Sequence, residues 1–244
     1  MSAVLREAWS TMVPDRDDPH GPLPPLMLAL TVVTGLIDAF SYLTLGHVFV
    51  ANMTGNIVFS GFAIAGATGF SLAASVAALA AFSLGALLGG RLAHSASRHR
   101  ARVLRLTLAV ETVLVAGALL VTQLADQPYG EGPRYLLIVL LGLAMGVQNA
   151  AARALAVPDL TTTVLTLTIA GAAADSRLAG GPGGRAGRRL LSAAAMFLGA
   201  LVGGFAVLHG HPGLALLLAA VLLAAGTLTA MLLTRSRAAW TAPA

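Results

Sequence analysis

The sequence has no cysteine and no lysine, and only 10% of its residues are charged. The lack of cysteine excludes disulfides, thiolate metal sites and cysteine nucleophiles. Soluble domains carry about 25% charged residues, whereas 57% of this chain is hydrophobic. These values predict an all-α polytopic membrane protein that contacts the lipid bilayer. The formal charge of +5 comes from arginines between apolar segments, which is typical of membrane topology and does not indicate nucleic-acid binding.

Eight apolar segments can be distinguished, and six of them reach the roughly 20 residues that a spanning helix needs. The second and sixth are shorter, and each follows a polar stretch. The first 22 residues are polar and lack the apolar run of a signal peptide, so we expect a largely disordered cytoplasmic tail that Trp9 and Met12 could hold on the membrane surface. The eight segments are Leu23–Leu45, Thr54–Phe70, Ser71–Leu92, Val103–Leu124, Tyr135–Ala156, Leu160–Ala174, Leu190–His209 and Leu214–Leu233.

An internal repeat divides the membrane region into residues 23–125 and 134–235, flanked by tails 1–22 and 236–244. Residues 80–90 align with residues 194–204, and both stretches contain Gly-x-x-x-Gly, a spacing that lets two helices approach closely. These glycine faces could pack within one chain or join two copies in a homodimer. In the same alignment Gly35 and Asp38 lie opposite Gly146 and Asn149.

Arginine placement predicts the orientation in a bacterial cytoplasmic (inner) membrane. Arginines cluster after the third, sixth and eighth apolar segments, and basic residues tend to stay in the cytoplasm. The third segment then runs inward and its repeat partner, the seventh, runs outward, so the two repeats are inverted. This requires six spanning helices plus two short broken or re-entrant helices, with both termini in the cytoplasm. We expect Arg98 and Arg185 on the cytoplasmic side, and Asp126 and Gly210 outside.

The two breaks before the short segments hold most of the candidate site residues. Inverted repeats with discontinuous helices are typical of secondary transporters, whose substrate lies near the midplane. Helix N-termini favour anions, so we expect a small anion or polar organic molecule as substrate. The predicted substrate-binding residues are Asp38, His47, Asn52, Thr54, Gly55, Asn56, Gln148, Asn149, Arg153, Thr162, Thr163 and Thr166.

Asp38 and Glu111 are the two acids inside full-length apolar segments, and they are candidates for proton coupling. Asp38 could pair with Arg153, bind a proton or a sodium ion, or hydrogen-bond the broken backbone. A purely structural role stays open for both acids. His47 has no second histidine at ligand spacing. His209 and His211 are close together on an outer loop with no carboxylate nearby, where only weak metal contact is possible, so neither a metal site nor a cofactor is expected.

The pattern Gly35-x-x-Asp38-Ala39, followed by Phe49-x-x-Asn52-x-Thr54-Gly55-Asn56, resembles the signature of the YoaK family. These are bacterial integral membrane proteins grouped as a domain of unknown function. The resemblance runs from about residue 24 to residue 235. It implies a membrane protein and is consistent with transport, but it supplies no substrate.

A transporter is the preferred interpretation, because the polar residues cluster at two breaks and do not line a continuous path. A channel-like pore and a non-transporting membrane scaffold or sensor are the alternatives. No nucleophile and base can be assembled from the sequence, so an enzyme is not expected.

Overall fold

The computed structural model describes residues 3–15, 18–97, 99–163, 165–175, 179–181, 186–235 and 238–242. Over these residues the chain is helical and contains no strand. Six helices are long and apolar enough to cross a membrane, as the sequence predicted. They are α2 (Leu23–Thr44), α4 (Leu72–Ser95), α5 (Arg100–Leu124), α6 (Glu131–Leu155), α8 (Ala186–Leu208) and α9 (Pro212–Leu233).

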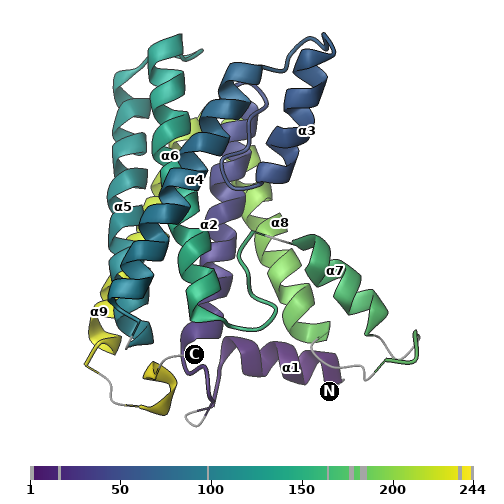
Figure 1. Ribbon diagram of the computed structural model, residues 1–244, viewed down its shortest axis with the longest axis vertical. Coiled ribbons are helices and arrows are strands. Elements are labelled where there is room, and N and C mark those ends of the chain that lie inside the picture. The colour runs from purple at the N-terminus through teal and green to yellow at the C-terminus, as the bar shows by residue number, and fades with distance from the viewer. Residues whose placement is uncertain are drawn as a thin grey trace.

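The two remaining apolar helices are too short to cross a bilayer. α3 (Met53–Ile64) has 12 residues and α7 (Leu165–Ala174) has 10. At 1.5 Å per residue they extend about 18 and 15 Å, whereas the hydrocarbon core is about 30 Å thick. In Figure 1, α3 lies in the upper part of the bundle and runs to its upper end, whereas α7 begins near mid-height and runs downward beside α8. The predicted combination of six long helices and two short ones is therefore confirmed.

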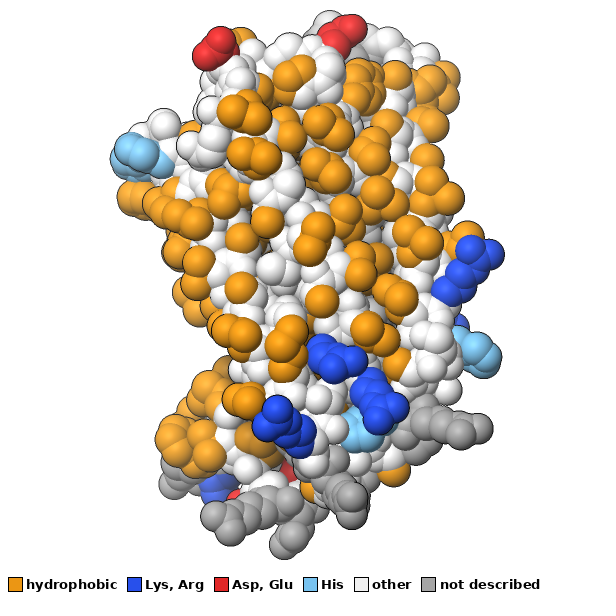
Figure 2. Space-filling model, turned by 90° about the vertical axis from the view of Figure 1, so that its left-hand side faces the viewer, with side chains coloured by type: hydrophobic (Ala, Val, Ile, Leu, Met, Phe, Trp, Pro, Cys, Tyr) orange, Lys and Arg blue, Asp and Glu red, His pale blue; other side chains and the backbone are white. Residues whose placement is uncertain are grey.

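The surface has the character of a lipid-facing protein. Figure 2 shows one face on which apolar side chains cover the middle, arginines gather toward the lower end and acidic side chains lie at the upper edge. Leu124, Phe197 and Leu232 are among many large apolar side chains that are exposed. Such a surface is stable only when lipid replaces water around it, so the long helices contact the bilayer.

Two pairs of helices approach so closely that only glycine fits between them. A Cβ atom added to Gly35 of α2 would lie 2.4 Å from the carbonyl oxygen of Met196 on α8. A Cβ atom added to Gly146 of α6 would lie 2.1 Å from the carbonyl oxygen of Phe82 on α4. The glycines of the Gly-x-x-x-Gly stretches are themselves buried in these same contacts. Both glycine faces are therefore covered inside the chain, and they are not free to join two copies in a homodimer.

The helix contacts of the first half recur in the second half. α4 packs along α6 as α8 packs along α2, and α5 contacts α6 as α9 contacts α2. α3 contacts α4 in the same way that α7 contacts α8. In Figure 1, α2 and α8 run upward while α4 and α6 run downward. Inverted repeats would produce this arrangement.

The N-terminal segment differs from the expected disordered tail. Residues Ala3–Met12 form helix α1, which lies crosswise at the lower end of the bundle. Its Glu7 carboxylate accepts a hydrogen bond from the backbone nitrogen of Gly187 in α8, at 3.0 Å. Near the other end of the chain, the short 3₁₀ helix Ala239–Thr241 places the buried Trp240 ring against Gly21. The prediction overlooked these contacts because each joins segments that are far apart in the sequence.

The predicted cytoplasmic markers Arg98 and Arg185 lie outside the described residues. Asp126 follows α5, and Gly210 joins α8 to α9. Both therefore lie at the upper end of the bundle in Figure 1, opposite the end at which α4 finishes and α8 begins.

Candidate functional site

Asp38 supports the first break, residues 45–52, which separates α2 from α3. Its Oδ1 atom accepts hydrogen bonds from the backbone nitrogens of Val50 at 3.1 Å and Ala51 at 2.9 Å. The side-chain amide of Asn52 donates to the other carboxylate oxygen. An unsatisfied backbone group in hydrocarbon costs several kcal/mol, so this buried carboxylate stabilises the break. Of the three roles considered for Asp38, the structure shows the hydrogen-bonding one.

Asn56 and Arg134 complete the support of the first break. The Asn56 side chain accepts from the backbone nitrogen of Phe49 at 3.0 Å and donates to the carbonyl oxygen of the same residue at 2.6 Å. Arg134, in the first turn of α6, donates from Nε to the carbonyl oxygen of Leu45 at 2.8 Å. A basic side chain is favourable at a helix C-terminus, where carbonyl groups lack partners. The first break is therefore held by side chains from α2, α3 and α6.

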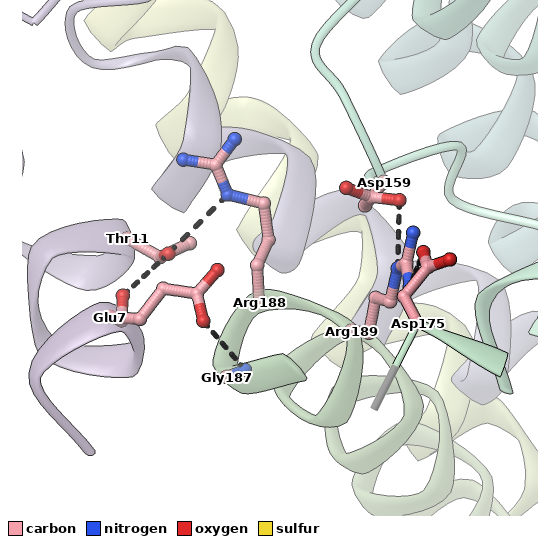
Figure 3. A network of polar contacts seen from close by, with 7 residues as sticks. All are labelled: Glu7, Thr11, Asp159, Asp175, Gly187, Arg188 and Arg189. Carbon is pink, nitrogen blue, oxygen red and sulfur yellow. Dashed lines mark hydrogen bonds and ion pairs between the residues drawn. The ribbon is translucent and has the colours of Figure 1, made fainter. Parts of the chain in front are cut away.

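The second break follows α6 and leads into α7. The side-chain amide of Asn149 donates a hydrogen bond to the hydroxyl of Thr163. Arg100 donates to the carbonyl oxygen of Leu155 at the end of α6, so a second arginine satisfies the second helix end. Arg189 of α8 binds Asp159 at 3.0 Å and Asp175 at 2.7 Å (Figure 3). These ion pairs join the break and the end of α7 to α8.

The second break has a strained backbone. Ala156, Asp159 and Thr162 have φ values of 48°, 62° and 62°. Residues other than glycine rarely adopt this region, and each such residue costs on the order of 1–3 kcal/mol. Such strain persists only where the surrounding contacts hold the chain, and it is concentrated at binding and switching sites.

A cavity of about 490 Å³ lies between the two breaks. The first turns of α3 and α7 both reach it, so two helix N-termini border the same space. Its described lining residues carry amide, hydroxyl, aromatic and thioether groups, and none of them is charged. They are Phe49, Ala51, Asn52, Met53, Thr54, Gly55, Phe82, Asn149, Thr163, Thr166 and Met196.

Half of the predicted site residues line this cavity, namely Asn52, Thr54, Gly55, Asn149, Thr163 and Thr166. The prediction missed the apolar part of the wall, in particular Phe82 on α4 and Met196 on α8. Both belong to long apolar segments, and the prediction selected only polar residues and glycine. The available signal was their equivalent position in the aligned repeat, because residue 82 falls opposite residue 196.

The other predicted residues lie outside the cavity wall. Asp38 on α2 and Asn56 on α3 are buried on either side of the first break, and they hold its backbone. His47 is exposed, and its Nδ1 lies 3.0 Å from the carbonyl oxygen of Gly69, which precedes α4. Gln148 is buried and donates to the Thr34 hydroxyl at 2.7 Å. Thr162 lies within the second break and is buried.

Arg153 does not pair with Asp38. It is exposed and lines a second hollow of about 610 Å³, together with His94 and Ser97 at the lower end. Asn149 lines both this hollow and the central cavity. The two spaces therefore meet at one side chain, one helical turn above Arg153.

Glu111 also lies away from the cavity wall. It is buried in α5, a helix that packs against α6 and α9. Its Oε1 atom has no hydrogen-bond partner among the described residues. The two predicted coupling residues therefore occupy separate environments, and only Asp38 reaches the cavity, through Asn52.

Comparisons with known proteins agree with a membrane protein. A family profile described as "Protein of unknown function (DUF1275)" matches residues 26–229, most of the chain. The UPF0700 transmembrane protein YoaK of Bacillus subtilis (strain 168) is 34% identical over 150 residues, which cover 59% of this chain and 63% of that protein. The match thus spans less than two thirds of the relative. No solved structure matches the chain.

Proposed function

The chain belongs to the DUF1275 family, as its resemblance to the YoaK signature predicted, and on this premise we propose that it is a small secondary transporter or exchanger of the bacterial cytoplasmic membrane. The observation that carries the proposal is the central cavity, because both breaks contribute to one wall. Irregular backbone at membrane depth is tolerated where it lines a cavity. Transporters place their substrates between discontinuous helices in the same way.

The helix pairing supports an alternating-access mechanism. The closest contacts join α2 to α8 and α4 to α6 through glycines, so each pair moves as one rigid unit. Each unit combines one helix from each half of the chain. Phe82 and Asn149 border the cavity from one unit, and Met196 borders it from the other. Rocking one unit against the other would expose the cavity first to one side of the membrane and then to the other.

The chemistry of the wall defines the substrate class. Two asparagines and three threonines provide donors and acceptors, and the N-termini of α3 and α7 border the cavity and favour negative charge. Phe49, Phe82 and Met196 provide apolar surface. The cavity volume of about 490 Å³ is typical of small-molecule sites. The substrate is therefore a small organic molecule with a carboxylate or carbonyl group and an apolar part.

Asp38 offers a route for proton coupling. Its ionised carboxylate is acceptor-only, and it holds Asn52 at the cavity wall. Protonation would turn one carboxylate oxygen into a donor and weaken the contact with the Asn52 amide. Because Asn52 borders the cavity, a proton on Asp38 would alter the substrate site.

A ligand screen with matched variants tests the proposal. Purified protein is heated with acetate, benzoate, phosphate, sulfate, nucleobases and sodium, since a ligand of the folded state raises its stability, by about 2.7 kcal/mol at one hundred times Kd. Hits are then tested for uptake and counter-exchange in proteoliposomes. Asn149→Ala and Thr166→Ala should lose both the thermal shift and the flux. Thr229→Ala is the control, because Thr229 lies exposed on α9 and bonds only the carbonyl of Ala225.

The substitution Asn149→Asp distinguishes an anionic substrate from a neutral carbonyl compound. A carboxylate at this position repels an anionic substrate, whereas a neutral carbonyl compound keeps the donors of Asn52 and the threonines.

Equal thermal shifts and equal flux in the wild type and both alanine variants would show that the cavity is not the substrate site. Flux without saturation or counter-exchange would indicate a pore. A protein that binds none of the compounds and supports no flux would be better explained as a scaffold or sensor.

A further inference from the structure

Helix α1 has an exposed apolar face. Leu5, Trp9, Met12 and Val13 are spaced i, i+4, i+7 and i+8, so they lie along one side of a helix that continues into a turn. Their exposed fractions are 57, 59, 45 and 54%. Apolar surface in water costs about 25 cal/mol for each Å². Four large apolar side chains on one face are therefore stable only where lipid or protein shields them from water.

The opposite face of α1 is bound to the first turn of α8. The Glu7 carboxylate accepts from the backbone nitrogen of Gly187, and Arg188 donates from Nε to the hydroxyl of Thr11 at 3.4 Å (Figure 3). Thr11 is completely buried. A Cβ atom on Gly187 would lie 2.4 Å from the carbonyl oxygen of Val4. These contacts set the rotation of α1 and leave its apolar face away from α8.

α1 lies at one end of a long apolar helix. Gly187 is at the start of the membrane-spanning candidate Ala186–Leu208, so α1 is held beside one end of a helix that is long enough to cross the membrane. α1 crosses the lower end of the bundle instead of running along it (Figure 1). Leu190, one turn further along α8, is 56% exposed and begins the lipid-facing side of that helix. α1 is therefore held beside a helix whose exposed side contacts the bilayer.

We propose that α1 is an interfacial helix, whose apolar face inserts between phospholipid headgroups and the upper acyl chains. Amphipathic helices bind membranes in this way, through buried apolar area plus attraction of basic side chains to lipid phosphates. Tryptophan is enriched at this boundary, and the exposed Arg6 flanks the apolar face. α1 lies outside the region that the family profile matches, residues 26–229. The inference does not depend on transport.

Tryptophan fluorescence in proteoliposomes tests this placement directly. The chain has two tryptophans, so Trp240→Phe leaves Trp9 as the single reporter. In vesicles of phosphatidylcholine with phosphatidylglycerol, lipids brominated near the top of the acyl chain should quench most of the Trp9 emission. Lipids brominated deeper in the chain should quench it less. Aqueous iodide should have little effect.

The complementary variant is the control. Trp9→Phe leaves Trp240, which is only 7% exposed and packs against Gly21, so its emission should respond weakly to both quenchers. If Trp240→Phe destabilises the protein, Met12→Cys provides a unique label site in this cysteine-free chain. Ser10→Cys, on the side of α1 away from the apolar face, is its matched control. The proposal would be overturned if aqueous quenchers reached Trp9 or a label at position 12 and brominated lipids did not. The apolar face would then be available to a protein partner.

Discussion

Asn149 is joined to Thr163 by a side-chain hydrogen bond across 14 residues, and Asp38 is joined to Asn52 across the same separation. Each pair ties a long helix to the segment just before the short helix that follows it. Both residues of the second pair lie 111 positions after those of the first. The pairs differ in charge, because a carboxylate in the first half is replaced by an amide in the second. The Asp38 carboxylate accepts three hydrogen bonds at the first break, whereas the Asn149 amide donates one to Thr163 at the second.

The first prediction concerns the donor and acceptor order at the first break. Asp38→Asn keeps one oxygen for the backbone nitrogens of Val50 and Ala51, but it turns a second donor toward the Asn52 amide. Leaving a buried polar group unsatisfied costs about 1–3 kcal/mol, and the free energy of unfolding should fall by this amount. Denaturant titration in detergent micelles measures the change.

The double variant Asp38→Asn with Asn52→Asp restores one donor facing one acceptor. It should therefore recover most of the lost stability. A double variant that is no more stable than Asp38→Asn alone would show that the carboxylate at position 38 acts through some other contact.

The second prediction concerns the glycine contacts between the long helices. Gly35→Ala and Gly146→Ala would place a Cβ atom against the backbone of α8 and α4, so the helices must separate. Overpacking of this kind costs about 1–3 kcal/mol. Gly61→Ala is the control, because it lies on α3 with no atom within 4 Å of the added Cβ. It should be neutral or gain about 0.5–1 kcal/mol, since alanine favours the helix. Loss of stability in all three variants would argue against close packing as the cause.

The third prediction concerns the ion pairs of Arg189. Its planar guanidinium binds Asp159 and Asp175 at once, whereas a lysine ammonium is a single point charge. Arg189→Lys should therefore increase hydrogen exchange in residues 157–175 and leave exchange in α2 and α4 unchanged. High ionic strength should enhance exchange in the wild type, because exposed charges are screened, and Asp175 is partly exposed. Unchanged exchange in Arg189→Lys would show that backbone contacts alone hold α7.

The fourth prediction concerns topology. Ser97, just after α4, and His209, just after α8, are exposed residues at opposite ends of the bundle. Ser97→Cys and His209→Cys introduce single thiols into a chain without cysteine. An impermeant thiol reagent applied outside intact cells should label position 209 and reach position 97 only after permeabilisation. Labelling of both positions from one side would rule out the inverted orientation of the two halves.

The sequence by itself determined the class of protein and the order of its helices. Apolar length is a local property, so the six long segments and two short ones could be recognised without knowing any contact. The repeat alignment placed Gly35 opposite Gly146, and both glycines make the close helix contacts that such spacing favours. Composition also identified the breaks, because Asn52, Thr54 and Thr163 are costly in hydrocarbon unless they are satisfied.

Only the tertiary structure decided what each polar residue does. Asp38 and Asn149 are equivalent in the alignment, yet one holds backbone while the other faces the cavity. Arg134 and Arg100 satisfy helix ends that lie 89 and 55 residues away, and α1 is ordered by contacts with α8 180 residues further on. The role of a side chain depends on how its helix is rotated about its axis and on the path that an irregular segment takes between two helices. Both are set by packing between distant segments, which no local pattern encodes.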